Sequence, residues 1–526
     1  MITDPIRLEI FKHLFAAIPE EMGVVLRKSS YSPNIKERRD FSCALFNASG
    51  EMIAQAAHIP VHLGAMPLSV QAAVDAFADD LHPGDMIILN DPYRGGTHLP
   101  DITLVAPIFI ETGAASFTLF GFAANRAHHA DVGGMAAGSM PIARELYQEG
   151  LIIPPLKLIA GGKIVRAAWD LLLANVRTPQ ERAGDLRAQI AANQRGVARL
   201  QAMLTRYGPD KVAMYMTALL DYTERMTRAL LLDLPDGTYA FTDYLDDDGL
   251  GSTDIPITVA ISIEGDAATV DFTGSAPQQK GSVNAVYAIT LSAVSYVFRC
   301  LLGLDVPNNS GGLRPVRVIA PEGTVVNARK PAPVAGGNVE TSQRITDVVL
   351  GAMAQAVPDR IPAASQGTMN NITIGGHDPR TDRPFTYYET ICGGTGGTPE
   401  GSGVSALHSH MTNTLNTPVE AMEYAYPFLV QRCEIRTGSG GAGHHPGGDG
   451  LVRDIQLLTD AEANLLTERR TRGAYGLNGG GEGLPGENIL RRDGVESPLP
   501  AKGRVELRAG DVISIHTPGG GGWGSV

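Results

Sequence analysis

The sequence predicts an α+β protein of several lobes, with mixed sheets, a long helical hairpin and a β-rich, Gly-rich C-terminal half. Apolar residues recur at helical spacing near the N-terminus and again over residues 178–233. From residue 237 onward the pattern changes to the two-residue alternation that is typical of strands. The chain has 61 glycines, and many of them gather in four C-terminal segments, namely 392–403, 438–450, 478–487 and 519–524. Such clusters indicate tight backbone passages in loops.

The chain of 526 residues is too long for one compact core, because domains usually hold roughly 100–200 residues. The changes of pattern divide it into four expected lobes. These are an N-terminal α/β lobe with a candidate metal site (1–170), a helical hairpin (171–235), a β-rich lobe (236–330) and a Gly-rich α+β lobe (331–526).

The first lobe reads as helices followed by strands. Helices are expected over 4–28, where Pro19 is a possible kink, and over 66–77; a strand pair is expected at 43–46 and 52–56. Three further strands follow at 85–89, 102–110 and 116–123, with a loop over 90–100. Because consecutive strands often pair, the loops at their ends are expected to meet in space.

The hairpin begins at Thr178, which with Pro179 and Glu181 matches a capping box. It turns at 207–209 and serves either as core scaffold or as a subunit interface. Beyond it, the alternating pattern predicts strands at 239–244, 257–263, 268–272, 316–319 and 504–515. Trp523, inside the last Gly-rich segment, suggests that this tail packs against the protein.

Composition excludes several classes of protein. The net charge of −13 and the lack of a Lys/Arg run argue against nucleic-acid binding. The four cysteines form no CxxC pair, which excludes a thiolate zinc finger and favours a reducing compartment. A basic-then-apolar leader and an apolar run of about 20 residues are both missing from the sequence. We therefore expect a soluble, cytoplasmic protein without a membrane segment.

Two loops rich in His and Asp carry the sharpest chemical signal. The first holds His98 and Asp101, three residues apart around Pro100, and the second holds His128 and His129. Each loop lies at the end of a predicted strand, and functional side chains in proteins are often found in such loops. Imidazoles and one carboxylate suit a divalent ion such as Zn, Mn or Fe and leave coordination positions open. The alternative is that these are turn residues with capping hydrogen bonds.

Other polar residues are candidates on weaker patterns. Asp40 precedes a strand and is a possible further ligand, although a salt bridge to Arg38 or Arg39 explains it equally. His58 and His62 flank Pro60, so they either line a pocket or are buried and satisfied by hydrogen bonds.

Two later segments are also dense in hydrogen-bonding groups. Glu340 follows a Gly turn, and His408 and His410 lie in a polar loop. These residues and His62 are candidates for binding a polar substrate, or they satisfy the backbone of irregular loops. Cys392 has no evident paired base, which argues against a thiol nucleophile.

The sequence lacks recognisable nucleotide-binding motifs. No GxxxxGK[ST] occurs, and the GxGxxG runs at 438–443 and 519–524 do not open a helix after a strand. A GxSxG elbow is missing as well. Any nucleotide is therefore expected to bind elsewhere, or to bind here in an unfamiliar way.

Eight stretches, in this order, resemble the hydantoinase B/oxoprolinase family. They are ERRDFSC (37–43), HIPVHLG (58–64), NDPYRGGTHLPD (90–101), HHADVGG (128–134), GGNVE (336–340), NTLNTPVE (413–420), SGGAG (439–443) and the Gly-rich end through Trp523. They span nearly the whole chain, so the resemblance is specific.

The resemblance implies a B-type subunit that works with an ATP-binding A-type partner in an α2β2-like hetero-oligomer. The partner phosphorylates the oxygen of a small cyclic amide, such as a hydantoin, 5-oxoproline or another lactam, and the B-type subunit completes hydrolysis at its metal. The motif match places His98 and Asp101 at the metal with His128 or His129, and Asp40 is a weaker match. His98, Asp101 and His128 are then the expected catalytic residues.

Two other functions stay open on the sequence. The chain is either an α-type subunit of an ATP-dependent ketone carboxylase or a scaffold that only organises the A-type partner. The chain is shorter than expected for the carboxylase subunits, which favours hydrolysis.

Overall fold

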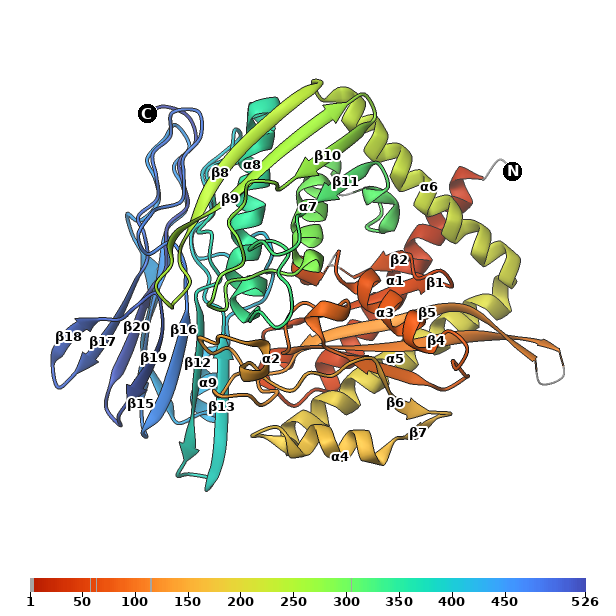
Figure 1. Cartoon of the computed structure of the whole chain (residues 1–526), viewed down its shortest axis with the longest axis horizontal. Helices are drawn as coiled ribbons and strands as arrows, with labels where there is room; N and C mark the ends of the chain where they lie inside the picture. The colour runs from red at the N-terminus through yellow and green to blue at the C-terminus, as the bar shows by residue number, and fades with distance from the viewer. Residues whose placement is uncertain (1–3, 57, 63, 114–115, 304) are drawn as a thin grey trace.

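The computed structural model describes residues 4–56, 58–62, 64–113, 116–303 and 305–526, and it confirms the α+β class. Four sheets are linked by helices, as Figure 1 shows. Hydrophobic residues from all four expected lobes contribute to one large core, so the lobes share their interior. The lobe boundaries at 170, 235 and 330 stay predictions.

The N-terminal helix α1 (Pro5–Ser29) is continuous through Pro19. Asp4 caps it by accepting a hydrogen bond from the backbone N–H of Ile6. Its buried face includes Phe11 and Phe15 and packs on α5 and on the first sheet. The helix thus covers the sheet that carries the candidate site.

The first sheet has seven antiparallel strands in the order β2-β1-β5-β4-β3-β6-β7. Its strands are β1 (Phe41–Asn47), β2 (Met52–Gln55), β3 (Met86–Leu89), β4 (Asp101–Gly113), β5 (Ser116–His128), β6 (Leu156–Ala160) and β7 (Lys163–Ile164). The helices α2 (Pro33–Lys36), α3 (Met66–Phe77) and α4 (Arg166–Ala174) accompany it. The predicted strands at 85–89, 102–110 and 116–123 correspond to β3, β4 and β5, and the predicted pairing of β4 with β5 is confirmed.

The predicted hairpin consists of α5 (Pro179–Tyr207) and α6 (Pro209–Asp233). The predicted capping box does not form, because the Thr178 side chain makes no capping hydrogen bond. Helix α5 packs across β4 and β5, where Gln189 and Asn193 bond to the Asn125 side chain. The hairpin therefore buttresses the two strands that carry the candidate site.

The second sheet has the order β11-β10-β9-β8, formed by β8 (Gly237–Asp247), β9 (Thr253–Glu264), β10 (Ala267–Asp271) and β11 (Val316–Ile319). Alternate residues of β9 are buried, as the two-residue alternation predicts. Two helices that the sequence analysis does not predict complete this part, namely α7 (Tyr287–Leu302) and α8 (Ser342–Ala356). Helix α8 packs on β8 and β9 (Figure 1).

The C-terminal half holds a sheet of order β13-β12-β16-β19 and one of order β14-β15-β20-β17-β18. The strands are β12 (Asn371–Asp378), β13 (Arg383–Glu389), β14 (Phe428–Arg436), β15 (Gly450–Leu457), β16 (Ala461–Leu466), β17 (Glu487–Arg492), β18 (Val495–Pro498), β19 (Lys502–Leu507) and β20 (Val512–His516), with helix α9 (Val419–Ala425) between β13 and β14. Both sheets bury side chains in one cluster. The single strand predicted at 504–515 is instead two strands, one in each sheet.

The glycine clusters pack backbone directly against backbone. A Cβ on Gly394 would lie 1.9 Å from the carbonyl oxygen of Gly448, so no larger residue fits there. The segments are cross-linked by backbone hydrogen bonds, such as Gly441 N–H to Gly520 O at 2.8 Å. The last segment is part of this packing, and Trp523 pairs with His445. The expectation that the tail packs down is confirmed.

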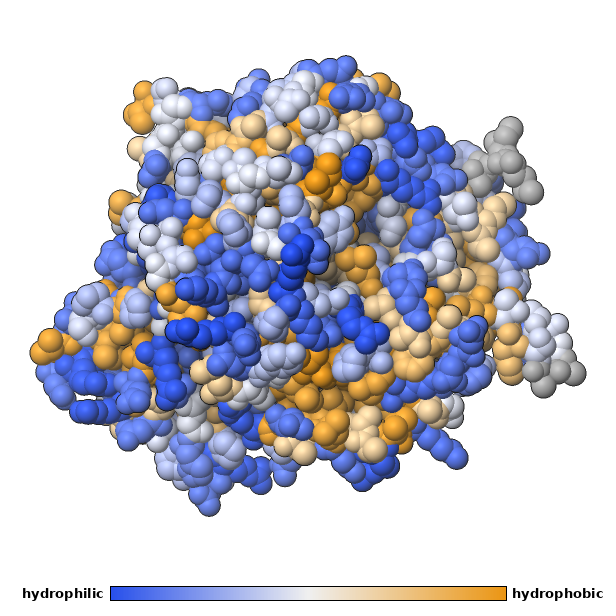
Figure 2. Space-filling model, viewed as in Figure 1, coloured by the Kyte–Doolittle hydropathy of each residue, from blue (hydrophilic) through white to orange (hydrophobic). Residues whose placement is uncertain are grey.

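The face of the molecule seen in Figure 2 is largely hydrophilic, with hydrophobic residues gathered in several separate patches. None of the helices in the described part of the chain combines the length and hydropathy needed to cross a membrane.

Candidate metal centre

The hairpin of β4 and β5 brings the two His/Asp loops together. Asp101 begins β4 and His128 ends β5, and the two are paired directly across the strands. The turn before β4 closes with a hydrogen bond from Asp101 N–H to the His98 carbonyl at 3.1 Å. This turn places His98 Nε2 3.1 Å from Asp101 Oδ1. The pairing of β4 with β5 places His128 Nδ1 3.4 Å from the same oxygen. Three donor groups thus converge on one point.

The three groups fit a single divalent ion. Ligand atoms that lie about 2.0–2.2 Å from one ion are about 2.8–3.6 Å from each other in tetrahedral or octahedral geometry. The two measured separations fall within this range, and all three residues are buried. His98 Nε2 also lies 3.1 Å from Asn338 Nδ2, while the Asn338 Oδ1 has no hydrogen-bond partner among the described residues. A cation would satisfy this crowded set of lone pairs.

The second oxygen of Asp101 is held by protein groups. Thr97 Oγ1 donates to it at 2.6 Å, and His62 Nε2 lies 3.4 Å away. Burial opposes ionisation of Asp101, but the imidazoles of His98 and His62 hold the pKa of its carboxyl well below its usual range. The carboxylate is therefore charged and oriented, as a metal ligand requires.

His128 is held in place by contacts from two other segments. Its ring stacks on Tyr388 with centroids 4.2 Å apart, and the Arg38 guanidinium in turn lies 4.9 Å from the Tyr388 ring centroid. The Asn34 side chain donates to the His128 carbonyl. These contacts restrict the imidazole to one orientation.

His129 faces away from the cluster. Its Nε2 lies 2.9 Å from Gln189 Oε1 on α5, and burial, followed by the charge of Arg182, lowers its pKa to about 4. Neighbouring strand residues point to opposite faces of a sheet. The geometry therefore favours His128 over His129 as the third ligand, a choice that the sequence leaves open.

Asp40 lies beside the cluster without joining the three donor atoms. Its carboxylate is 3.7 Å from Arg38, and its carbonyl accepts the His128 N–H at 3.0 Å. Burial raises the pKa of this carboxyl. Asp40 also lines the small cavity that His62, Asp101 and His128 line, so it faces the same space.

Glu340 lies one layer behind Tyr388. It belongs to a π-helical turn (Gly337–Thr341) and accepts hydrogen bonds from Met369 N–H at 3.2 Å and Asn371 Nδ2 at 2.8 Å. Asn371 Oδ1 in turn accepts from the Tyr388 hydroxyl at 3.0 Å. Burial raises the pKa of Glu340 to about 8. Glu340 is thus connected to His128 through Asn371 and Tyr388.

His408 and His410 lie away from the three donors. The half-buried His408 lies beside Asn416, and burial lowers its pKa to about 3. His410 lies 3.4 Å from the Tyr296 hydroxyl and 3.9 Å from Asp347. Their proposed role in binding substrate stays a prediction.

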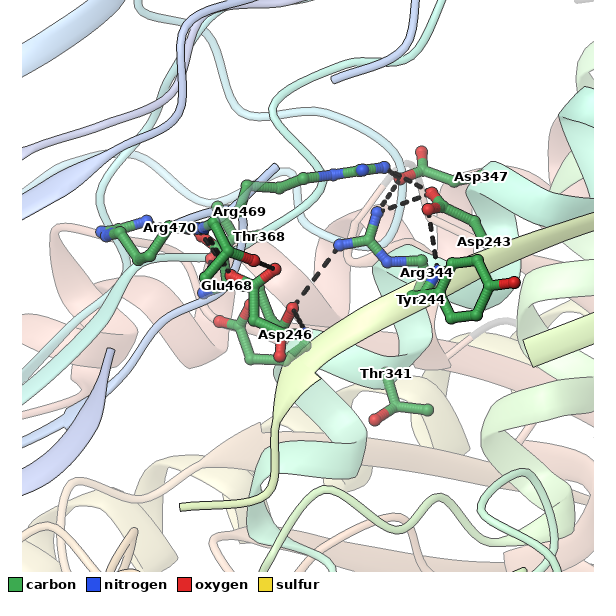
Figure 3. Close-up of polar contacts among 12 residues, drawn as sticks. Asp243, Tyr244, Asp246, Thr341, Arg344, Asp347, Thr368, Glu468, Arg469 and Arg470 are labelled. Atoms are coloured by element: carbon green, nitrogen blue, oxygen red, sulfur yellow. Dashed lines mark hydrogen bonds and ion pairs between the residues drawn. The ribbon is translucent and has the colours of Figure 1, made fainter. Parts of the chain in front are cut away.

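A second buried charge network joins three parts of the chain. Arg344 on α8 and Arg469, after β16, point toward Asp243 on β8 and toward Asp347 (Figure 3). Behind them Glu468 pairs with Lys502 and lies 3.6 Å from Arg344. The alternation of opposite charges indicates a structural clamp between the second and third sheets.

Several residues around the donors lie outside the sequence-based candidates. Tyr388, Thr97 and Asn34 contact the donors from three separate segments, and Asn338 lies within the GGNVE stretch. Only Asn338 and Thr97 carry a signal in the sequence, because they belong to stretches that resemble the family. Tyr388 comes from β13, far away in the sequence.

Comparisons with known proteins find relatives over the whole length of the chain. The family model described as hydantoinase B/oxoprolinase matches residues 4–526. The chain is 40% identical to 5-oxoprolinase 1 of Arabidopsis thaliana, covering 100% of this chain and 42% of that protein. It is 31% identical to the putative B-type subunit of a D-/L-hydantoinase from a Pseudomonas strain, covering 99% of this chain and 90% of the relative.

Two solved structures share the fold. The ATP-dependent caprolactamase from Pseudomonas jessenii superposes with a TM-score of 0.90 at 31% identity, over 100% of this chain and 92% of that one. An acetone carboxylase chain superposes with a TM-score of 0.86 at 19% identity, over 99% and 76%, and this likeness concerns the fold alone. With a family model that matches residues 4–526, the chain belongs to the hydantoinase B/oxoprolinase family.

Proposed function

We propose that this chain is the metal-site subunit of an ATP-dependent hydrolase that opens small cyclic amides. The observation that carries the proposal is the buried set of His98, Asp101 and His128, whose donor atoms face one point. A divalent ion of the Zn, Mn or Fe type held there would polarise a substrate oxygen and lower the pKa of a nearby water. The relatives named for 5-oxoproline, hydantoin and caprolactam support a cyclic amide as the class of substrate.

The residues of the chain itself prepare this site. Thr97 and His62 hold the second oxygen of Asp101, so that its first oxygen remains directed at the imidazoles. The apolar side chains of Ile59, Val61 and Met411 line the small cavity and limit the access of bulk water. A cyclic amide resists hydrolysis because its carbonyl is electron-rich and its nitrogen leaves poorly. Phosphorylation of the amide oxygen by a partner removes this resistance.

The partner in this proposal is an A-type chain that binds ATP. The sequence contains no P-loop, and one relative is itself named as a single component of a hydantoinase with more than one kind of chain. The chain spans 42% of Arabidopsis 5-oxoprolinase 1, so the remainder of such longer proteins is large enough to supply the ATP-binding function. An α2β2-like assembly and a cytoplasmic location stay predictions.

The test is turnover by the complex purified with its A-type partner. Incubation with ATP and hydantoin, 5-oxoproline or caprolactam is expected to release phosphate and ring-opened product in equal amounts. ATP-independent ring opening, or no opening of any cyclic amide, would contradict the proposal.

The second candidate is an ATP-dependent ketone carboxylase, which the fold of acetone carboxylase favours. Its test uses the same complex with acetone, acetophenone and labelled bicarbonate. Label in an acid product would support carboxylation and exclude hydrolysis as the main activity. If the complex holds no metal and turns over neither cyclic amides nor ketones, the remaining role for this chain is a scaffold for the A-type partner.

A further inference from the structure

A surface cleft lies next to the metal centre. It has a volume of about 510 Å³ and is lined by α1, the end of β2, the segment 305–308 and part of α7. A second hollow of about 370 Å³ adjoins it, because both are lined by Glu20, His58 and Asn413. Each of the two volumes is within the range of small-molecule sites, which is about 300–1,000 Å³.

A wall of two short segments separates this cleft from the metal cavity. The two segments are residues 58–62 and 411–415, and they are joined by a hydrogen bond from Val61 N–H to the Met411 carbonyl at 3.2 Å. Each segment has residues that line the cleft and residues that line the metal cavity. The side facing the metal cavity is formed by Ile59, Val61, His62, Met411, Thr412 and Thr414. The side facing the cleft is formed by His58, Pro60, Asn413 and Leu415. The wall is therefore one layer of chain thick, and the cleft lies directly across it from the metal cavity.

Among the polar side chains that line the cleft, Gln55 brings an acceptor and His58 a donor of hydrogen bonds. The Oε1 atom of Gln55 is buried and has no hydrogen-bond partner in the part of the chain that the structure describes. An unpaired buried oxygen of this kind indicates a missing ligand or water. His58 Nδ1 accepts the Cys43 N–H at 3.2 Å, so its single ring proton is on Nε2. Burial lowers the pKa of His58 to about 4, which keeps the ring neutral near pH 7.

We propose that this cleft binds the cyclic amide substrate, with Gln55 and His58 recognising its cis-amide edge before the partner phosphorylates the amide oxygen. A small ring forces its amide into the cis form, so N–H and C=O lie on the same edge, whereas an open-chain secondary amide is trans. The N–H then donates to Gln55 Oε1, and the C=O accepts from His58 Nε2–H. Ala16, Ala54 and Pro60 contact the ring carbons. The proposal rests on the proposed function and names where its substrate first binds.

Adjacent residues of α1 provide a matched pair for the test. Ala16 lines the cleft, whereas the neighbouring Ala17 is exposed on the helix surface outside it. Ala16→Trp fills the cleft and leaves the metal donors, which line the cavity on the other side of the wall, unchanged, and Ala17→Trp adds the same side chain elsewhere. Gln55→Met keeps the length of the side chain and removes its acceptor.

The measurement is calorimetric titration of the metal-loaded chain with hydantoin, 5-oxoproline and caprolactam, with N-methylacetamide as the trans-amide control. Wild type and Ala17→Trp are expected to bind a cyclic amide equally and to prefer it to N-methylacetamide. Ala16→Trp should weaken binding at least about tenfold, since about 1.4 kcal/mol corresponds to that factor. Gln55→Met should weaken it about fivefold through the loss of one hydrogen bond of roughly 1 kcal/mol. His98→Ala should lose the metal and keep binding.

Two outcomes would overturn the cleft site. One is unchanged binding in Ala16→Trp, and the other is loss of binding in His98→Ala, which would place the substrate at the metal alone. Turnover by the partner complex separates this failure from that of the proposed function. A complex with Ala16→Trp that opens cyclic amides at the wild-type kcat/KM excludes the cleft and leaves the hydrolase intact. If the wild-type complex opens no cyclic amide and the wild-type chain binds none, both the cleft site and the hydrolase function are excluded.

Discussion

Asp101 and His128 lie directly opposite each other at the end of the β4–β5 hairpin, with His128 Nδ1 3.4 Å from Asp101 Oδ1. The pairing of β4 with β5 thus fixes the relative positions of two donors of the candidate metal site. His98 joins them through the turn that precedes β4, because it is only three residues before Asp101 in the sequence.

This register predicts that two neighbouring histidines behave differently. His128→Ala should lower the affinity for the metal at least about tenfold, because it removes a donor. His129→Ala should keep the metal and instead destabilise the fold by about 1–3 kcal/mol, because Gln189 loses its buried partner. Metal content after dialysis and urea unfolding measure the two effects. Equal metal loss in both variants would show that His129 also reaches the ion.

Tyr388 is expected to act through its ring more than through its hydroxyl. Tyr388→Phe keeps the stack on His128 and loses only the bond to Asn371, at a cost of about 1 kcal/mol in the free energy of unfolding. Tyr388→Leu should in addition weaken metal binding, because His128 loses its orienting contact. Competition with a chelator measures the affinity. If both variants bind the metal as the wild type does, the stack has no positioning role.

The buried charge network should matter far more than ion pairs at the surface. Arg344→Met removes one partner of Asp243 and Asp347 and should destabilise the protein by about 3–5 kcal/mol, because it leaves buried carboxylates unpaired. Arg228→Met breaks surface pairs with Glu224 and Asp266 and should lower stability far less, because water and salt screen these charges. Denaturant unfolding of both variants decides this. A similar small loss in each would mean that water compensates the buried carboxylates.

Glu340 should make stability depend on pH. Below the ordinary glutamate pKa, the carboxyl is protonated in both the folded and the unfolded chain. Above it, the unfolded chain ionises, while burial raises the pKa of folded Glu340 to about 8. The folded state then holds the extra proton, so the contribution of Glu340 to the free energy of unfolding falls as pH rises from about 4.5 to 8.

Glu340→Gln removes this titration and keeps an acceptor for Asn371. Urea unfolding at pH 5, 6.5 and 8 should show wild type losing stability relative to Glu340→Gln as pH rises. A constant difference between the two proteins across this range would show that Glu340 titrates with its ordinary pKa.

Local patterns in the sequence are enough to predict much of the first lobe. The strands expected at 102–110 and 116–123 follow each other in the sequence and are predicted to pair, and their pairing brings the two His/Asp loops together. The choice between His128 and His129 depends on which face of the sheet each residue points to. That choice follows from the register of β5 against β4, which no local pattern specifies.

Other features escape prediction because they arise from distant segments or from complete burial. Helix α8 is buried around most of its circumference, and its buried residues include the polar Gln343, Arg344 and Asp347, so its burial does not follow the usual separation of apolar and polar faces. Tyr388 and Asn338 meet the donors from β13 and from the turn before α8. The sequence predicts the glycine clusters at loops, but only the structure reveals that they allow backbones to pack against each other.

The central claim is that His98, Asp101 and His128 hold a metal on which ring opening depends. The most direct measurement is the ring-opened product formed from ATP and a cyclic amide by the partner complex, for wild type and His98→Ala. The account predicts an assembled His98→Ala complex with its metal lost and its product formation abolished, even if ATP is still consumed. Wild-type product formation by an assembled His98→Ala complex would contradict it.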